Sequence, residues 1–551
     1  MTDYGRKELM EQYANIDELT ELTFETYGCN FLSGTFPNLP NIKSIEIGYG
    51  KTLESGCFDG LTHLTALRIK HAFEIKIKPN VFSNLKNLET LELQYSKDSE
   101  NFNENTFKDL NNLKTLSLAY CNVNNLDIFR DLINLEELIL EQADNLTAVI
   151  KEDSFHRLKN LRILNLYMIE TGPLPDNIFN GLNNLEQLNL VCAKFSNFNS
   201  KVLHGKSKLT SLYLTSNELK TLDENIFQNC PNLEILHLDR NLFTELPIYL
   251  FKDLNKLQEL QLDGNQLEKL SPEHFIDLEN LETLKLSENK LKTLPQKIFQ
   301  NLKNLTSLNL DQNEIETLDK DLFHGLSKLD SLILDEMKIT SIDANIFQGL
   351  NKLTYLCLSD NNLGSLPENI FNPLENLETV YICNIGLEKF DPALFSKNEK
   401  LTKLSIYKNN FPVLKKGSFT GLSGLKDLQL DRLQIKEIEL GAFDDLTNLT
   451  VLNLEENNIE NLKPNTFANL KNLEDLNLQK NKLTSFDRYV IQGLENLASI
   501  NLADNKLKQI DPNIARVTKK KLFIFYSDNQ LSQSQSDEFY EQFQKIQNEM
   551  F

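Results

Sequence analysis

Apolar positions recur along this chain at a spacing that fits neither a helix nor a long alternating strand. The stretch 281–304, LETLKLSENKLKTLPQKIFQNLKN, shows the unit most clearly. Its apolar residues are Leu281, Leu284, Leu286, Leu291, Leu294, Phe299 and Leu302. This spacing predicts a short strand over 281–286, a turn marked by Asn289, and an irregular or one-turn return segment held by Phe299.

The same unit repeats through most of the sequence. From Leu185 the strand-opening residue recurs every 24 positions, at Leu209, Leu233, Leu257, Leu281, Leu305, Leu329, Leu353, Leu377, Leu401, Leu425, Leu449, Leu473 and Leu497, with Lys521 in register. Before Leu185 the spacing varies, through Leu161, Leu135, Leu113, Leu88, Leu64, Ile42 and Leu19. About 22 coils result. Because one coil cannot bury its apolar face alone, we expect them to stack into one cooperative array.

The strand and turn of each unit read LxxLxLxxN, the pattern of a leucine-rich repeat. The 24-residue form resembles that of Toll-like receptor ectodomains, Slit-type guidance proteins and other extracellular animal proteins, over about residues 19–530. The resemblance implies an α/β leucine-rich repeat solenoid, shaped as a horseshoe, with a parallel sheet on its concave face and irregular or short helical segments on its convex face. The cysteine-rich caps usual in those families are missing here.

Three segments follow from the pattern. We expect a polar lead-in over 1–18, the solenoid over 19–530, and an amphipathic helix over 531–551. Within the solenoid, coils 19–208 are irregular and coils 209–530 regular. Ser536 is the predicted N-cap of the helix, and its apolar stripe comprises Phe539, Phe543, Ile546 and Met550. The stripe predicts a helix laid across the open solenoid end as a cap, and pairing with another chain is the alternative.

Two sets of repeated residues are interpreted as structural. Asparagines follow the strands, as at Asn217, Asn241, Asn265, Asn289 and Asn313, and are expected to form a hydrogen-bonded ladder. Phenylalanines from Phe227 to Phe467 form a spine in the return segments. From Met337 the asparagine position alternates between apolar residues and asparagine, and the pattern alone gives no reason for this.

A column of aromatic residues is the best candidate binding surface in the N-terminal third. Tyr49, His71, Tyr95 and Tyr120 stand seven positions after the strand-opening residue in four successive coils. The line continues less regularly through Gln142 and Met168, with Tyr167 beside it. Tyrosine is favoured at binding hot spots, because it offers rigid area with a polar tip. A self-packing ladder that only stabilises the sheet is the alternative.

Acidic residues form a second candidate surface. Asp239, Asp263, Asp311 and Asp335 share one concave column of the repeat, with Glu336 and Asp360 beside it. Like charges at the spacing of neighbouring strands repel each other. The column therefore indicates a basic ligand or a bound cation.

Charge narrows the class of partner. The chain has 57 basic and 79 acidic residues, a formal net charge of −22, which argues against nucleic acid or an anionic membrane and favours a protein ligand, with a basic one the best match. An acidic surface that only keeps the solenoid soluble is the alternative. No segment reaches the roughly 18 apolar residues of a membrane span, and the start lacks the apolar run of a signal peptide.

Cysteines and sequons add little chemistry. The seven cysteines lie in separate coils without a CxxC pair, so neither a disulfide framework nor a metal site is expected. Cys121 and Cys230 are interpreted as buried apolar fillers. Candidate glycosylation sites are Asn145, Asn304 and Asn448, of which the last two coincide with the recurring Asn-Leu that opens a strand.

No enzyme motif occurs, and we predict no catalytic, cofactor-binding or metal-binding residue and no cofactor. The resemblance implies a non-catalytic protein-binding module: an extracellular or cell-surface, receptor-like or secreted glycoprotein that holds a protein ligand on its concave face, in innate immunity or cell signalling. The alternative is a cytosolic scaffold for signalling proteins, favoured by the missing signal peptide and caps. The sequence is compatible with a homodimer or a heterodimer.

Overall fold

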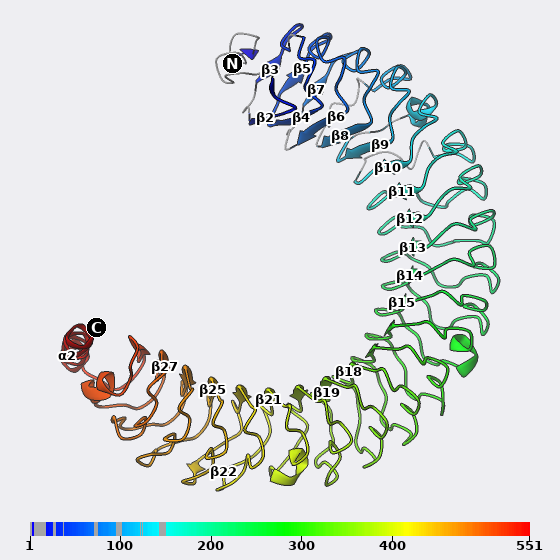
Figure 1. Ribbon diagram of the computed structural model, residues 1–551. Coiled ribbons are helices and arrows are strands. Elements are labelled where there is room, and N and C mark those ends of the chain that lie inside the picture. Colours follow the sequence, from blue (N-terminus) through cyan, green and yellow to red (C-terminus); the bar gives the residue numbers. More distant parts are fainter. Residues whose placement is uncertain are drawn as a thin grey trace. The chain divides into compact units, whose positions relative to one another are not determined.

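The computed structural model describes residues 3–4, 18–25, 29–36, 38–70, 75–94, 102–121, 123, 125–142 and 150–551. The chain forms two compact units. The first comprises Met1–Leu267 and Glu273–Leu281, and the second comprises Glu268–Pro272 and Glu282–Phe551. In each unit, short parallel strands lie along one side of stacked coils and return segments lie along the other (Figure 1).

The first unit contains two parallel sheets. The strands of its main sheet, in spatial order, are β2 (Glu21–Glu25), β4 (Ser44–Gly48), β6 (Ala66–Lys70), β8 (Thr90–Gln94), β9 (Thr115–Ala119), β10 (Glu137–Ile139), β11 (Ile163–Asn165), β12 (Gln187–Asn189), β13 (Ser211–Tyr213), β14 (Ile235–His237) and β15 (Glu259–Gln261). A smaller sheet comprises β1 (Asp3–Tyr4), β3 (Asn30–Phe31), β5 (Thr52–Leu53) and β7 (Lys76–Ile77). The 3-10 helix η3 spans Leu126–Phe129. Helix η5 spans Pro272–Phe275, of which all but Pro272 belong to this unit.

The second unit repeats this arrangement. The strands of its main sheet are β16 (Thr283–Lys285), β17 (Ser307–Asn309), β18 (Ser331–Ile333), β19 (Tyr355–Cys357), β20 (Thr379–Tyr381), β21 (Lys403–Ser405), β23 (Asp427–Gln429), β25 (Val451–Asn453), β26 (Asp475–Asn477), β27 (Ser499–Asn501) and β28 (Phe523–Phe525). Strands β22 (Val413–Leu414) and β24 (Glu437–Ile438) form a separate pair. The helices are η6 (Pro392–Phe395), η7 (Pro512–Arg516) and α2 (Gln533–Met550).

The repeat pattern predicts this architecture correctly. The two main sheets have eleven strands each, twenty-two in the described part of the chain, which agrees with the count from the sequence. Return segments are turns and short 3-10 helices, as expected. In most strands the central residue is buried and its two neighbours are half-buried, because alternate side chains point to opposite faces. No helix in the described ranges is both long and apolar enough to cross a membrane.

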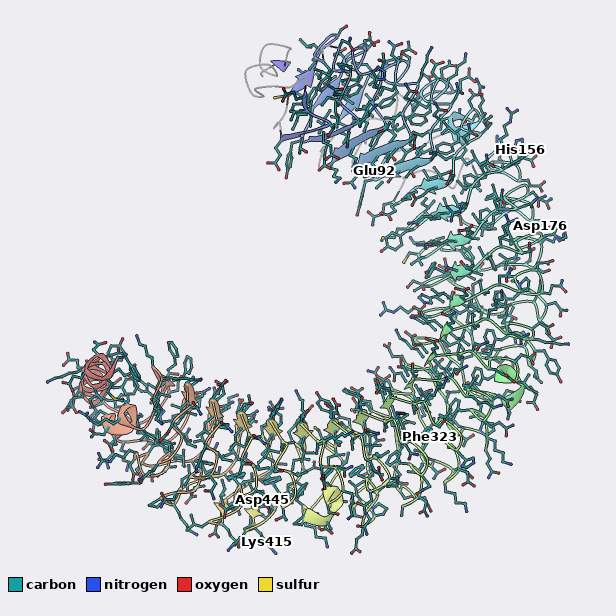
Figure 2. All side chains as sticks on the ribbon, in the orientation of Figure 1. Glu92, His156, Asp176, Phe323, Lys415 and Asp445 are labelled. Carbon is teal, nitrogen blue, oxygen red and sulfur yellow. The ribbon has the colours of Figure 1, made fainter. Side chains whose placement is uncertain are left out.

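Phenylalanines fill the space between strands and return segments. Phe323 is fully buried inside its coil (Figure 2). Phe371 is fully buried as well, and its ring stacks on that of Phe347 at 6.3 Å and on that of Phe395 at 4.9 Å, centroid to centroid. The spine therefore joins successive coils by direct ring contacts, which confirms its structural role.

The asparagine ladder satisfies backbone groups where each strand turns away from the sheet. Asn313 Nδ2 donates to the carbonyl oxygens of Leu286, at 2.9 Å, and Leu310, at 2.9 Å. Its Oδ1 accepts from the backbone N–H of Leu291 at 3.1 Å. One side chain therefore serves its own coil and the preceding one, because a primary amide offers two donor hydrogens and an acceptor.

This reach explains the alternation after Met337. Asn409 Nδ2 donates to the carbonyls of Ile382, at 2.9 Å, and Ile406, at 2.8 Å. Its Oδ1 accepts from the N–H groups of Ile385, at 3.2 Å, and Leu387, at 3.0 Å. Every second coil can thus lack asparagine and still have its turn satisfied by the next coil, while an apolar residue fills the vacated position.

The two singled-out cysteines differ in role. Cys230 is fully buried, and burial raises the pKa of its thiol to about 12, as expected of an apolar filler. Cys121 occupies the asparagine position, and its Sγ lies 3.5 Å from the carbonyl oxygen of Leu93 in the preceding coil. Cys121 is buried, as predicted, and its thiol also acts as a weak donor in the ladder.

Helix α2 begins earlier than the sequence suggested. Its N-cap is Ser532 rather than Ser536, because Ser532 and Gln535 form a reciprocal capping box. Phe539, Phe543 and Ile546 are buried, whereas Met550 is 37% exposed. Gln547 Nε2 donates to the carbonyl oxygen of Leu522 at 2.8 Å. These contacts support the proposal that residues 531–551 close the end of the second unit.

Candidate functional site: the concave sheet faces

The side chains beside the buried strand residues form the face on which a ligand would sit. In β16, Leu284 is buried while Thr283 and Lys285 point to the opposite side of the sheet. Glu92 on β8 lies on the strand side of the first unit, whereas His156 and Asp176 lie on the return side (Figure 2). Each coil thus contributes two strand side chains and then the residues of its turn.

The predicted aromatic column coincides with a left-handed turn position. Tyr49, Tyr120 and Met168 have φ angles of 57°, 59° and 56°, a region that non-glycine residues seldom occupy. Tyr49, Tyr120 and Tyr167 are half-buried, and Met168 is 40% exposed. The other two members of the column, His71 and Tyr95, lie outside the described residues. Whether the column binds a ligand or only stabilises the sheet therefore stays a prediction.

The four aspartates divide between the two units. In the first unit, Asp239 is only 6% exposed and accepts a hydrogen bond of 2.7 Å from Thr215 Oγ1, so little of its carboxylate faces a ligand. Asp263 stands one coil further on, where its carbonyl oxygen accepts from Arg240 N–H at 2.7 Å. Asp311 and Asp335 occupy neighbouring coils of the second unit, where Gln312 N–H donates to the Asp335 carbonyl at 3.0 Å.

Asp335 lies in a group of three carboxylates on the second unit. Asp335, Glu336 and Asp360 each have one carboxylate oxygen that lies within 4.8 Å of the corresponding oxygens of the other two. Burial, with the negative charges of Asp360 and Glu336, raises the pKa of Asp335 to about 6, while the Cys357 thiol facing it offsets part of the rise. In the described ranges this is the one group of three or more acidic, histidine or cysteine side chains close enough to hold a metal ion.

Asp335→Asn is expected to change the pH dependence of stability. A carboxyl whose pKa rises on folding, from about 3.9 to about 6, destabilises the fold increasingly as pH rises through that interval. The variant should therefore unfold with nearly the wild-type free energy at pH 4. At pH 7.5 it should be more stable by about 1–3 kcal/mol, the lower end allowing for partial solvent screening. Urea unfolding of the variant and the wild type at both pH values measures this. A stability difference between the two proteins that is the same at pH 4 and pH 7.5 would contradict the raised pKa of Asp335.

Aromatic residues on the second unit were missed by the sequence reasoning. Tyr355 on β19 and Tyr381 on β20 have ring centroids 5.6 Å apart. Lys403 Nζ lies 5.7 Å from the Tyr381 ring centroid and 2.9 Å from the carboxylate of Asp427. The tyrosines stand two and four positions after their strand-opening leucines, in concave columns other than the aromatic and acidic columns predicted from the sequence. Their signal in the sequence is an aromatic residue at a concave position in each of two successive coils.

A hollow near the C-terminal end of the same face is lined by polar and apolar side chains together. Its volume is about 330 Å³, and Asn453, Asn477 and Asn501 line it beside Phe525. The three asparagines are held by bonds from the backbone N–H two residues on, each of 3.0–3.1 Å. Phe523 and Phe525 are 60% and 56% exposed. This part of the face therefore presents fixed amides next to two open aromatic rings.

The glycosylation candidates also differ in surroundings. Asn145 lies outside the described residues. Asn448 is exposed, and its Nδ2 donates to the carbonyl of Ser423 at 2.8 Å. Asn304 is half-buried, and its Oδ1 accepts from Lys328 Nζ at 2.6 Å. A glycan on Asn448 would leave one amide N–H for the existing bond.

Comparison with known families matches the repeat over most of the chain. A family model described as a BspA type leucine rich repeat region matches the segments 30–162, 125–258, 173–306, 220–349 and 292–413. A leucine rich repeat model matches 399–459, 423–483 and 471–514. No curated protein matches the chain.

Several solved structures share the fold. The TLR13–ssRNA13 complex aligns with a TM-score of 0.68 and 24% identity, over 90% of this chain and 79% of that one. The plant peptide hormone receptor RGFR1, in complex with RGF2, aligns with a TM-score of 0.57 and 22% identity, over 92% and 89%. Toll from Drosophila, in complex with Spatzle, aligns with a TM-score of 0.55 and 20% identity, over 96% and 64%.

Proposed function

The chain belongs to the leucine-rich repeat family, and from that premise we propose that it is a non-catalytic recognition protein that holds a protein ligand on its concave sheet faces. The observation that carries the proposal is the contrast between the two sides of each strand. The central residues of β19, β20 and β21, which are all buried, are Leu356, Val380 and Leu404 and change little. On the concave side the matching positions hold Tyr355, Thr379 and Lys403. A rigid scaffold that repeats its core and varies its face is suited to specific recognition.

The structural neighbours and the charge support a protein ligand. RGFR1 is in complex with RGF2 and Toll with Spatzle, whereas TLR13 is in complex with RNA. A net charge of −22 disfavours RNA for this chain. On this proposal Tyr49, Tyr120, Tyr167 and Met168 contribute to contact in the first unit, and the acidic residues make a basic ligand the better match.

An extracellular or cell-surface location, with a role in innate immunity or cell signalling, is the finer part of the proposal and rests on the likeness to receptor ectodomains. Glycosylation at Asn448 would accompany export. The mass of the protein from its source tissue, before and after glycosidase treatment, tests this part. A mass above 63.5 kDa that falls on treatment supports export, and a mass equal to that of the bare chain contradicts it.

A second candidate, a cytosolic scaffold for signalling proteins, is favoured by one observation. All seven cysteines lie within the described residues and none of them forms a disulfide, as is usual where the compartment is reducing. Six of them are buried and Cys192 is half-buried, so none needs an oxidising environment to fold. The glycosidase experiment separates the two candidates.

Tyr49→Ala combined with Tyr120→Ala tests the binding role of the first unit. If the column contacts the ligand, the double variant should lose about tenfold or more of the partner that the immobilised wild-type chain retains from source extract. Its unfolding midpoint should stay within about 2 °C, because both side chains are partly exposed. Tyr249→Ala, at a 49% exposed tyrosine on a return segment, is the matched control. A midpoint lowered by several degrees with retention unchanged would make the column structural.

A further inference from the structure

Strands β18 to β21 carry a face on which aromatic rings and uncompensated carboxylates meet. The strands pair in register, so that Ser331 neighbours Tyr355, Tyr355 neighbours Thr379, and Thr379 neighbours Lys403. Tyr381 lies two positions along β20, opposite Cys357. The rings of Tyr355 and Tyr381 are therefore held side by side by backbone pairing.

On the β21 side of the two rings, the protein supplies its own cation. Lys403 Nζ lies 5.7 Å from the Tyr381 ring centroid and pairs with Asp427 at 2.9 Å. In the coil that contains Lys403, Lys408 Nζ likewise lies 5.9 Å from the ring centroid of Tyr407. Tyrosine rings on this face thus attract cations, and the acidic neighbour of the first lysine is neutralised.

On the β18 side of the two rings, negative charges have no cation beside them. Asp335, Glu336 and Asp360 present oxygens within 4.8 Å of one another, and none forms an ion pair with a lysine, arginine or histidine in the second unit, all of whose residues are described. Asp335 Oδ1 is buried and accepts no hydrogen bond there. Asp335 has the weak Cys357 thiol and the backbone N–H of Glu336 as partners, and Asn384 Nδ2 donates to Asp360 Oδ1 at 2.5 Å. The charge of Asp335 also acts on the nearby Tyr355, whose pKa it helps to raise. Three close negative charges need a positive group.

We propose that this face docks an arginine-bearing segment of a protein partner. It is called the tyrosine–carboxylate face below and comprises Tyr355, Tyr381, Asp335, Glu336 and Asp360. This inference rests on the proposed function and gives its ligand a chemistry. The guanidinium lies against the exposed side of the Tyr355 ring and donates to the carboxylates of Glu336 and Asp360.

The combination of groups favours arginine over other cations. A guanidinium is planar, stacks on aromatic rings and donates along a fork that fits carboxylates. A calcium ion takes six to eight oxygen ligands and gains nothing from the neighbouring rings. The lysine pairings at Tyr381 and Tyr407 show that a cation on a ring is already the local pattern.

Fluorescence anisotropy with a defined probe tests the proposal on the full chain. The probe is a fluorescein-labelled nonapeptide, (Arg-Ser-Gly)3, and its control carries citrulline for arginine, which keeps the shape and removes the charge. We expect the arginine peptide to bind at least tenfold more tightly than the citrulline peptide at low salt, and binding to weaken as salt is added. Binding should also weaken from pH 7.5 to pH 5, as Asp335 becomes protonated.

Variants then locate the site. Glu336→Gln with Asp360→Asn should weaken binding about tenfold or more, Tyr355→Ala about fivefold, and Tyr355→Phe less than twofold. The matched control is Glu455→Gln with Glu456→Gln, a concave acidic pair already neutralised by Lys480 at 3.3 Å and Arg432 at 2.9 Å. Unfolding midpoints within about 2 °C of wild type confirm that the variants fold.

Three outcomes would overturn the inference. Equal losses in the test and control pairs would show attraction to overall negative charge. Displacement of the peptide by 1 mM calcium, with calcium binding lost in the Glu336→Gln and Asp360→Asn variant, would make the cluster a metal site. Absence of arginine-peptide binding would reject this ligand chemistry alone, because concave binding of another protein is measured independently by retention from source extract.

Discussion

Asn409→Leu is expected to lower the free energy of unfolding of the second unit by about 4 kcal/mol or more. The substitution removes the only partner that the described structure gives to the carbonyls of Ile382 and Ile406 and to the N–H groups of Ile385 and Leu387. Each buried backbone group left without a partner costs about 1–3 kcal/mol. Urea unfolding followed by circular dichroism measures the loss.

The same change at Asn481 is the matched control and should cost only about 1–2 kcal/mol. Asn481 donates to the carbonyls of Leu454 and Leu478, which also accept from Asn457 and Asn505. It also donates to the carbonyl of Gln479, which accepts from Glu456 N–H as well. Only the N–H of Ile459 loses its side-chain partner. Equal losses at Asn409 and Asn481 would contradict the account of the alternation.

Phe371→Ala is expected to destabilise the second unit by about 3–5 kcal/mol, the usual cost of emptying a phenylalanine site in a packed core. The ring is fully buried and stacks on Phe347 and Phe395. Because stability in a repeat array comes from contacts between neighbouring coils, the loss should weaken coupling on both sides of this coil. Amide hydrogen exchange should therefore speed up in the flanking coils as well.

Phe371→Leu separates the cavity from the ring contacts. Leucine keeps much of the buried volume, so its cost should be clearly smaller than that of alanine. If alanine costs less than about 1 kcal/mol, the spine does not join the coils.

Local pattern sufficed for the coil itself. The positions of Leu284, Phe323 and Asn313 within their coils follow from the spacing alone, because each repeats through the chain and has one physical role. The predicted helix start at Ser536 was wrong, since serine alone does not fix an N-cap, and Ser532 has Gln535 three residues on to complete a capping box.

Contacts between neighbouring coils could not be predicted from the spacing within one coil. Asn409 serves a carbonyl 27 residues earlier in the chain, and only the stacking register shows that this makes an asparagine in the Ile385 coil unnecessary. The pairing of Tyr355 with Tyr381 likewise depends on the alignment of β19 with β20. The left-handed turn at Tyr49 and Tyr120 is a backbone property that the residue type argues against.

Photo-cross-linking from matched positions tests the central claim, that the concave faces bind a protein, most directly. A benzophenone amino acid replaces Tyr381 on concave β20 in one variant and Tyr489, 48% exposed on a return segment of the same unit, in another. Each is irradiated in source extract, with and without excess wild-type chain. The account predicts a discrete protein adduct from position 381 that excess wild-type chain suppresses, and none from 489. Adducts from position 489 with none from 381 would contradict it.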